Sequence, residues 1–284
     1  MGQSKSRKTK ERWPAIYKGE EKDTPVVVIS HKRAARVKTS KIVSPTIIAV
    51  EESQAAEYRE HNPDEEIVTH PDSVLGLSEK RQWTYEHFGD HWQLNDDLKA
   101  FSRCYLPPSY GASRQAKIND PELVYDILQM IARTAKQIKA YVFGVAYWTN
   151  EIQFSPFRPL RLGGLVNGNG FGIFDSPKLA FNTDIQASND FYITLINAYY
   201  HRYCYIDTRF AFHEDKMFAD QEGGLSGFRT MASEKKDMEI LQSLFGTEVV
   251  ELKLPKTKVG KQNPNTKKVT QMRHQWQKRL RIPF

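Results

Sequence analysis

Cysteine is scarce in this 284-residue chain, and long apolar runs are missing from it. Cys104 and Cys204 occur in unrelated contexts, which argues against a disulfide framework and against a cysteine-based zinc site. No stretch approaches the roughly 18 uncharged apolar residues of a membrane span, and the polar, basic residues 1–12 contain no signal-peptide core. We therefore expect a cytoplasmic protein without a membrane partner.

Acidic residues are absent from the last part of the chain. Residues 253–284 hold ten Lys or Arg and no Asp or Glu, and residues 1–12 hold five basic residues and one acid. These two segments carry a net charge of +14 in a chain of net charge +7, so the remainder carries −7. An acidic body with basic ends predicts a polyanionic partner that binds the ends.

The composition is that of a globular protein, with 39% apolar and 12% aromatic residues. We expect three parts. Residues 1–24 are a flexible basic arm with few apolar anchors, residues 25–252 are one folded domain, and residues 253–284 are a basic tail.

Strand and helix patterns alternate four times in the first third of the chain. Val26–Ile29 is a continuous β-branched run, typical of a parallel strand that is buried on both faces. The remaining pattern predicts strands at 46–50, 66–70 and 92–94, and helices at 53–60, with Ser53 as N-cap, and 78–88. This alternation favours a parallel α/β sheet.

Polar residues follow three of these strands. Ser30 and Arg33 follow the first, Glu51 follows the second, and the turn Asn95-Asp96-Asp97 follows the fourth. In an open α/β sheet, ligands bind beyond the carboxyl ends of the strands, and adjacent acids on a rigid strand suit a hard divalent cation. Charged helix starts and a solvated turn are the structural alternatives.

The second half of the chain has a mixed pattern. After a turn-rich loop at 101–116, a long amphipathic helix is expected to start at Pro121. Later strands are expected at 141–148, 203–212 and 248–252, with helices at 191–200 and 233–245. The glycines of 167–170 indicate a hairpin turn, or a close approach of the backbone to a ligand. The predicted core stripe of the long helix is Leu123, Ile127, Met130, Ile131, Ala135 and Ile138.

Four βα cycles that end in an acidic turn, followed by a mixed half with a carboxylate at a helix start, resemble the GT-A fold of nucleotide-sugar glycosyltransferases. Over about residues 25–252 the chain looks most like the TET-associated glycosyltransferases of phage DNA modification, relatives of the base J glucosyltransferase. The resemblance rests on residues 76–81, on Asn189-Asp190, and on the GGLSGFR loop (223–229) with the helix ending in Phe-Gly that follows it. It implies an α/β, GT-A-like fold, in which a Rossmann-like nucleotide-sugar-binding sheet is joined to a mixed-sheet acceptor half.

The resemblance also implies roles for particular residues. Asp97 matches the acid that binds Mn²⁺ or Mg²⁺ on the donor diphosphate, whereas Asn95 stands where the family has its first acid. Asp190 is the expected catalytic base, and His213 is a compatible further metal ligand. The expected donor-binding residues are Ser30, Arg33, Glu51, Arg81, Asn95, Asp96, Gly224 and Arg229.

The function implied by the resemblance is sugar transfer from a nucleotide sugar, most simply a UDP-sugar, to the hydroxyl of 5-hydroxymethylcytosine or 5-hydroxymethyluracil in phage DNA, within the host cytoplasm. Basic tail residues would bind DNA phosphates without reading sequence. One alternative is a GT-A enzyme with a non-DNA acceptor. Another is a non-catalytic nucleic-acid-binding protein. The expected DNA-binding residues are Lys256, Lys258, Lys267, Lys268, Arg273, Lys278, Arg279 and Arg281.

Overall fold

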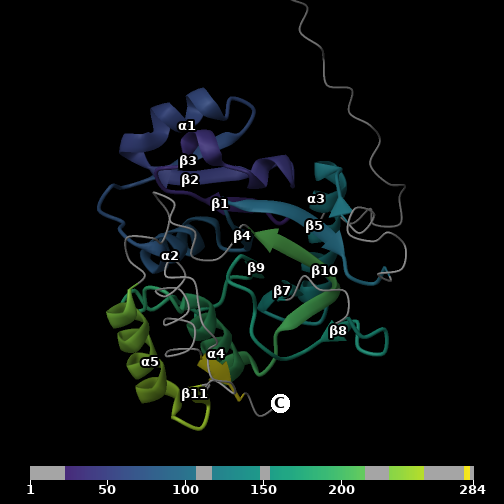
Figure 1. Ribbon diagram of the computed structural model, residues 1–284, viewed down its shortest axis with the longest axis vertical. Helices are drawn as coiled ribbons and strands as arrows, with labels where there is room; N and C mark the ends of the chain where they lie inside the picture. The colour runs from purple at the N-terminus through teal and green to yellow at the C-terminus, as the bar shows by residue number, and fades with distance from the viewer. Residues whose placement is uncertain (1–22, 107–116, 148–153, 215–229, 253–277, 282–284) are drawn as a thin grey trace, which may run out of the picture.

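The computed structural model describes residues 23–106, 117–147, 154–214, 230–252 and 278–281 (Figure 1). Within these ranges most strands belong to one ten-stranded sheet, in which β8 (Leu160–Arg161) pairs with β10 beside the main path. The order along that path is β3 (Glu66–His70), β2 (Ile47–Glu51), β1 (Val26–Ile29), β4 (His91–Asn95), β9 (Gly170–Ile173), β7 (Val142–Ala146), β10 (Tyr205–Glu214), β5 (Leu98–Arg103) and β6 (Lys117–Ile118).

The first four strands form the parallel block that the sequence predicts. β1 pairs in parallel with β2 and with β4, and β2 pairs in parallel with β3. Val28 lies opposite Ile48 on one side and Leu94 on the other, and all three side chains are buried. Continuous β-branched runs suit this block because both faces of its strands are covered. The α/β prediction is confirmed.

Helices cover both faces of the sheet, and a smaller unit packs beside them (Figure 1). α1 (Ala55–His61) and α3 (Pro121–Gln137) pack on the face that carries Trp92, whereas α2 (Leu77–Phe88) and α4 (Asn189–His201) pack on the face that carries Phe171. α5 (Met231–Phe245) packs against α4 together with the two-stranded sheet of β11 (Val250–Leu252) and β12 (Lys278–Leu280). No helix of the described segments combines the length and apolar character needed to cross a bilayer.

The long helix α3 begins where the sequence places it but turns a different stripe to the sheet. The Asp120 side chain caps it by accepting hydrogen bonds from the backbone N–H groups of Glu122 and Leu123. Met130 and Ile138, predicted as core, are 38% and 37% exposed. That part of the prediction is wrong, because the buried face also includes Val124 and Leu128, which were not predicted, whereas the predicted Ile131 and Ala135 are buried as expected.

The glycine run at 167–170 leads into β9 and does not form the predicted hairpin. β9 lies antiparallel between β4 and β7, and β8 pairs with β10. A Cβ at Gly172 would lie 2.1 Å from the Phe143 ring, and one at Gly170 would lie 2.7 Å from the Leu94 side chain. The hairpin prediction is wrong because β9, the strand that follows the run, pairs with β4 and β7 and not with β8.

Two further expectations need correction. Residues 101–103, expected in a loop, complete β5, because that strand pairs antiparallel with β10. Ser53 does not cap α1, because its hydroxyl donates to Asp72 and Gln54 occupies the N-cap position. The predicted glycine loop at 223–229 lies outside the described residues, as does 107–116.

Candidate functional site

The predicted polar clusters meet at one edge of the sheet. β1, β2 and β4 are parallel neighbours, so their carboxyl ends, which lead to Ser30, Glu51 and Asn95, lie side by side. The acidic turn then connects β4 to β5. The Thr39 hydroxyl braces this turn by donating to the Asn95 carbonyl at 2.5 Å and accepting from the Leu98 N–H at 3.2 Å. The acids are therefore presented on a fixed support.

Asp96 points into the protein. Its carboxylate is buried and accepts hydrogen bonds from the Ser30 hydroxyl at 2.5 Å and from Arg33 at 2.9 Å. Burial raises the pKa of Asp96, although the Arg33 charge and the hydrogen bonds oppose that rise. With both oxygens already bonded, Asp96 and Ser30 fix the end of β1 to the turn, so the expected direct donor contact is not the role that the geometry gives them.

Asp97 is the more accessible acid of the turn, with a side chain that is 30% exposed. Arg33 donates to its Oδ2 at 3.3 Å, and Oδ1 has no hydrogen-bond partner among the described residues. Although burial lowers the pKa of Arg33, the two carboxylates raise it overall, so the guanidinium stays charged. An unused carboxylate oxygen beside a fixed turn is the type of ligand that a hard divalent cation takes.

His213 lies near the end of β10, beside the same turn. In the antiparallel register, Glu214 is opposite Leu98, the residue that follows Asp97, and His213 is opposite Ala100. The His213 Nε2 shares a 2.6 Å hydrogen bond with the Ser102 hydroxyl. Among the described residues, no three His, Cys, Asp or Glu side chains are grouped to hold a metal ion. A divalent ion would therefore need ligands from elsewhere, and Mg²⁺ usually takes them from substrate phosphates.

A second polar group surrounds Glu51 at the end of β2. The buried Glu51 carboxylate accepts a hydrogen bond from the Lys80 ammonium, and its Oε1 lies 2.5 Å from the His31 Nδ1. Burial alone would raise the pKa of Glu51, but Lys80 outweighs it and the pKa is lowered. The other oxygen, Oε2, has no partner in the described structure. Glu51 is thus a fixed carboxylate with one oxygen still able to accept a hydrogen bond.

The residues around Glu51 were only partly expected. Lys80 on α2 and His70 on β3 are both buried, and burial lowers the pKa of each. Neither residue was predicted to be buried, and for Lys80 the reason is that lysines in helices are usually exposed. The available signal was the adjacency of Lys80 to Arg81 on the helix that precedes the acidic turn.

Arg81 is entirely buried between α2, β4 and the start of β9. One nitrogen, Nη2, donates to the Gly168 carbonyl at 2.5 Å and to the Asn95 side chain at 3.4 Å. Its carbon Cζ lies 4.9 Å from the centroid of the Phe171 ring. Burial lowers the pKa of Arg81 to about 10, an effect that the negative charge of Asp190 opposes. Nε and Nη1 have no hydrogen-bond partner among the described residues.

Asp190 lies in the first turn of α4, where its charge is favourable to the helix dipole. Its Oδ1 accepts a hydrogen bond from the Phe191 N–H at 2.9 Å. Gly168 makes room for this carboxylate, since a Cβ there would lie 3.1 Å from the Asp190 Oδ2. The structure thus brings together three residues singled out in the sequence, Arg81, Asn95 and Asp190.

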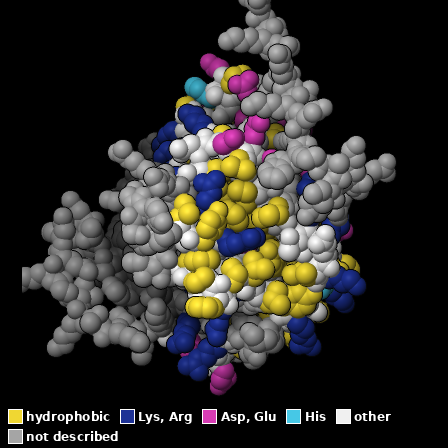
Figure 2. Space-filling model, turned by 90° about the vertical axis from the view of Figure 1, so that its right-hand side faces the viewer, with side chains coloured by type: hydrophobic (Ala, Val, Ile, Leu, Met, Phe, Trp, Pro, Cys, Tyr) yellow, Lys and Arg dark blue, Asp and Glu magenta, His cyan; other side chains and the backbone are white. Residues whose placement is uncertain are grey.

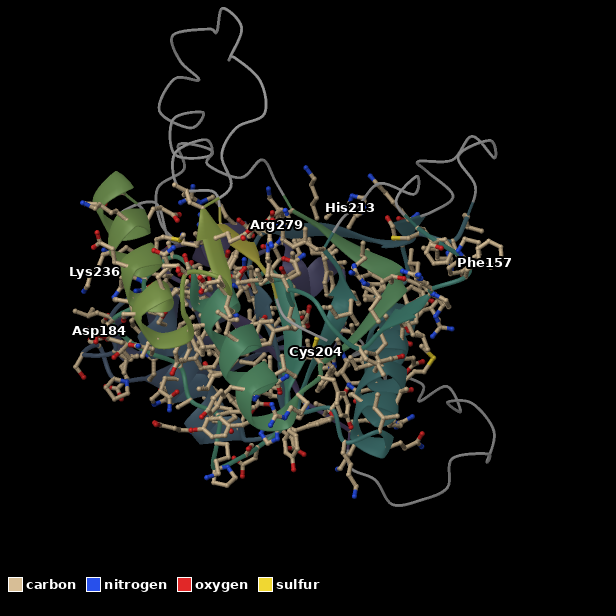
Figure 3. All side chains as sticks on the ribbon, turned by 90° about the horizontal axis from the view of Figure 1, so that it is seen from below. Phe157, Asp184, Cys204, His213, Lys236 and Arg279 are labelled. Carbon is tan, nitrogen blue, oxygen red and sulfur yellow. The ribbon has the colours of Figure 1, made fainter. Side chains whose placement is uncertain are left out.

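The basic tail is described only at residues 278–281. Arg279 is exposed, and Arg281 pairs with Glu251 at 2.8 Å. Lys278 was expected to bind DNA. That prediction is wrong, because the Lys278 ammonium is buried and pairs with Glu234 at 2.6 Å. Arg279 and His213 lie toward the same margin of the molecule (Figure 3). The remaining expected DNA- and donor-binding residues, Lys256, Lys258, Lys267, Lys268, Arg273, Gly224 and Arg229, lie outside the described residues.

Chemically, the edge offers two kinds of group. Arg33, Lys80 and Arg81 supply positive charge that is already oriented by carboxylates or carbonyls, which suits a polyphosphate ligand. Asp97 and Asp190 supply carboxylate oxygens of a kind that serves metal binding and proton transfer.

Comparisons with known proteins identify the family of this chain. The crystal structure of TarS 1-349 from S. aureus is similar at 11% identity, with a TM-score of 0.40, over 80% of this chain and 73% of the TarS chain. No match was found among curated proteins. A family model described as TET-Associated Glycosyltransferase matches residues 24–224, a range that includes the acidic turn, Arg81 and Asp190. The chain is therefore a glycosyltransferase and belongs to the TET-associated glycosyltransferase family.

Proposed function

We propose that this glycosyltransferase moves a sugar from a nucleotide-sugar donor, most simply a UDP-sugar, to the hydroxyl of a hydroxymethylated pyrimidine in phage DNA. The observation that carries the proposal is the grouping of Arg81, Asn95 and Asp190 beside the acidic turn, at the carboxyl ends of the parallel strands. Ligands of open α/β sheets bind at that edge. The family description, with its reference to TET, supports a modified base in DNA as the acceptor.

The leaving diphosphate needs compensation of its negative charge. We propose that Asp97 holds Mn²⁺ or Mg²⁺ through its unbonded Oδ1, with the remaining ligands supplied by the donor phosphates. Such an ion acts as a Lewis acid and a template for the diphosphate. Arg33 holds the Asp97 carboxylate in place from its other oxygen, and His213 is a further ligand in this proposal.

The acceptor hydroxyl needs to lose its proton as it attacks. A bond forms between the acceptor oxygen and the anomeric carbon of the sugar, the bond from that carbon to the diphosphate oxygen breaks, and the electron pair leaves with the diphosphate. The proton passes to the Asp190 carboxylate, which acts as general base. Arg81, held by the Gly168 carbonyl, places its guanidinium close enough to interact electrostatically with Asp190.

Donor binding and transfer can be measured separately. A thermal-shift screen of nucleotide sugars, with and without Mn²⁺, detects any donor that binds the folded protein, because such a ligand raises its stability. The bound donor is then radiolabelled and offered with duplex DNA that contains 5-hydroxymethylcytosine or 5-hydroxymethyluracil. Metal-dependent incorporation into the modified duplex, but not into unmodified DNA, is the expected result. Incorporation into competing glycans, lipids or proteins alone contradicts the DNA acceptor.

A further inference from the structure

A cavity of about 480 Å³ lies next to the helix start that carries Asp190. The residue after Asp190, Phe191, forms part of its wall, as does the loop 163–165. That loop continues within three residues to Gly168, against which the Asp190 carboxylate packs. The cavity therefore adjoins the candidate base from both of the segments that hold that base in position. Volumes of this size are typical of ligand sites in proteins.

The wall of the cavity combines apolar side chains with basic ones. Among the residues that the structure describes there, none is acidic. Its apolar part comes from leucines and one aromatic ring: Leu160, Leu162, Leu165, Leu280 and Phe191. Arg158, Arg161 and Lys278 supply its positive charge. A ligand with a flat, weakly polar body and a negative group matches both parts of this wall.

The basic residues of the wall differ in how far they are already paired. Lys278 is held by Glu234, and its Nζ lies 6.0 Å from the centroid of the Phe191 ring, so it shapes the wall. The Arg161 guanidinium lies over Gly164. Arg158 is exposed on the loop that leads into β8, and no ion pair of its side chain is found within the described structure. Arg158 is thus the residue best placed to bind an incoming anion.

The surface that leads to the cavity is also apolar. Figure 2 shows apolar side chains spread over the side of the molecule where β8 and β10 lie, with Lys and Arg side chains set among them. Next to β8 in the sequence, Phe157 and Leu162 are 92% and 56% exposed. Aromatic and apolar side chains interleaved with arginines are the usual means by which proteins bind unstacked bases and their phosphates.

We infer that this cavity is the acceptor subsite and that it receives a pyrimidine nucleotide turned out of the DNA duplex. The inference rests on the proposed function, because that function supplies DNA as the acceptor. The base would lie against Phe191 and the leucines, and Arg158 would bind its phosphate. The hydroxymethyl group would lie at the end of the cavity formed by Phe191, next to the helix start that carries Asp190. Enzymes that act on a base within duplex DNA gain access to it by such extrusion, and they read the extruded base with apolar and aromatic side chains.

The test uses the full-length protein and a duplex that carries one hydroxymethylated pyrimidine next to 2-aminopurine, whose fluorescence rises when stacking is lost. Arg158→Ala is expected to weaken DNA binding about tenfold and to reduce the salt dependence by about one released ion. Arg59→Ala is the matched control, because Arg59 is an exposed arginine of α1 outside the site. A second variant, Leu165→Trp, narrows the cavity and is expected to reduce the fluorescence rise.

The outcomes separate this inference from the proposed function. If the wild type transfers sugar to DNA while Arg158→Ala binds DNA with unchanged affinity and salt dependence, the cavity assignment is wrong and the function stands. A wild-type complex without any 2-aminopurine response also overturns the assignment. A donor-induced thermal shift in each variant shows that it is folded. If the wild type neither transfers sugar to DNA nor changes the fluorescence, both proposals fail.

Discussion

The guanidinium of Arg33 donates to the Asp96 carboxylate at 2.9 Å, although 63 residues separate the two in the sequence. Both side chains are almost completely buried, at 12% and 6% exposure. The pair joins the loop after β1 to the acidic turn after β4. Because Arg33 also reaches Asp97, one guanidinium sets the positions of both acids.

Loss of Arg33 is expected to destabilise the fold. In Arg33→Ala the buried Asp96 loses its ion-pair partner, which costs about 3 kcal/mol of unfolding free energy. The pKa of Asp96 is already raised in the folded protein, and it rises further without Arg33. The loss is therefore larger at pH 7 than at low pH, where Asp96 is protonated. Urea unfolding at several pH values measures it, and a pH-independent loss contradicts this explanation.

Asp97→Asn is expected to abolish the Mn²⁺-dependent part of donor binding while the protein stays folded. An amide oxygen binds a hard cation more weakly than a carboxylate does. The measurement is the thermal shift produced by a nucleotide sugar with Mn²⁺. Asp64→Asn, which removes an exposed acid from the turn before β3, is the matched control. If Asp97→Asn retains the full metal-dependent shift, the acidic turn has a structural role only.

Asp190→Asn is expected to lower kcat by 10² to 10⁴, the usual contribution of a general base. The donor-induced thermal shift should persist, because Asp190 is not placed on the donor side in this proposal. Single-turnover transfer to modified DNA, followed as a function of pH, measures the effect. A variant that loses donor binding and rate together would show that Asp190 holds the donor and is not the base.

His91 gives the stability a pH dependence below neutrality. Burial lowers its pKa to about 4, and its Nε2 has no hydrogen-bond partner in the described structure. The unfolded chain takes up this proton near pH 6.5, whereas the folded protein does so only near pH 4, so stability falls between these values by about 3 kcal/mol. His91→Gln should flatten that part of the profile. Equal slopes in chemical denaturation of both proteins would refute the assignment.

The ion pair of Lys278 with Glu234 fixes the last described strand to α5. Lys278→Met alone removes the positive charge that pairs with the buried Glu234 carboxylate and is expected to cost about 3 kcal/mol. The double variant Lys278→Met with Glu234→Gln should recover most of that loss, since neither side chain then carries a charge. Thermal unfolding of the single and double variants measures the coupling. If the loss in the double variant equals the sum of the losses in the single variants, the two side chains are not coupled.

The parallel half of the fold was predictable because its strands consist of β-branched runs that are buried on both faces. Val26–Ile29 and its neighbours carry this signal directly. β9 was not predictable, because Gly170–Ile173 has glycines where strands usually have bulky residues. Only the packing of Phe143 and Leu94 against those glycines explains the strand.

Site residues that directly follow strands were predictable from the sequence. Residues whose burial depends on tertiary packing were much less predictable. Asn95, Asp97 and Asp190 occupy positions that sequence and family resemblance singled out. Lys80 was not singled out, and Lys278 was assigned to DNA binding, for one reason. A lysine is expected at the surface, and burial depends on a carboxylate that lies far away in the sequence, Glu51 in one case and Glu234 in the other.

The Phe143 ring fills the space that a side chain at position 172 would occupy. The side chains at positions 143 and 172 therefore compete for one volume between β7 and β9, so the size of one limits the size of the other. In other members of the family, a larger residue at the place of Gly172 should come with a smaller one at the place of Phe143. Such compensating exchanges would record, in sequences alone, how β9 is inserted between two strands that run the other way.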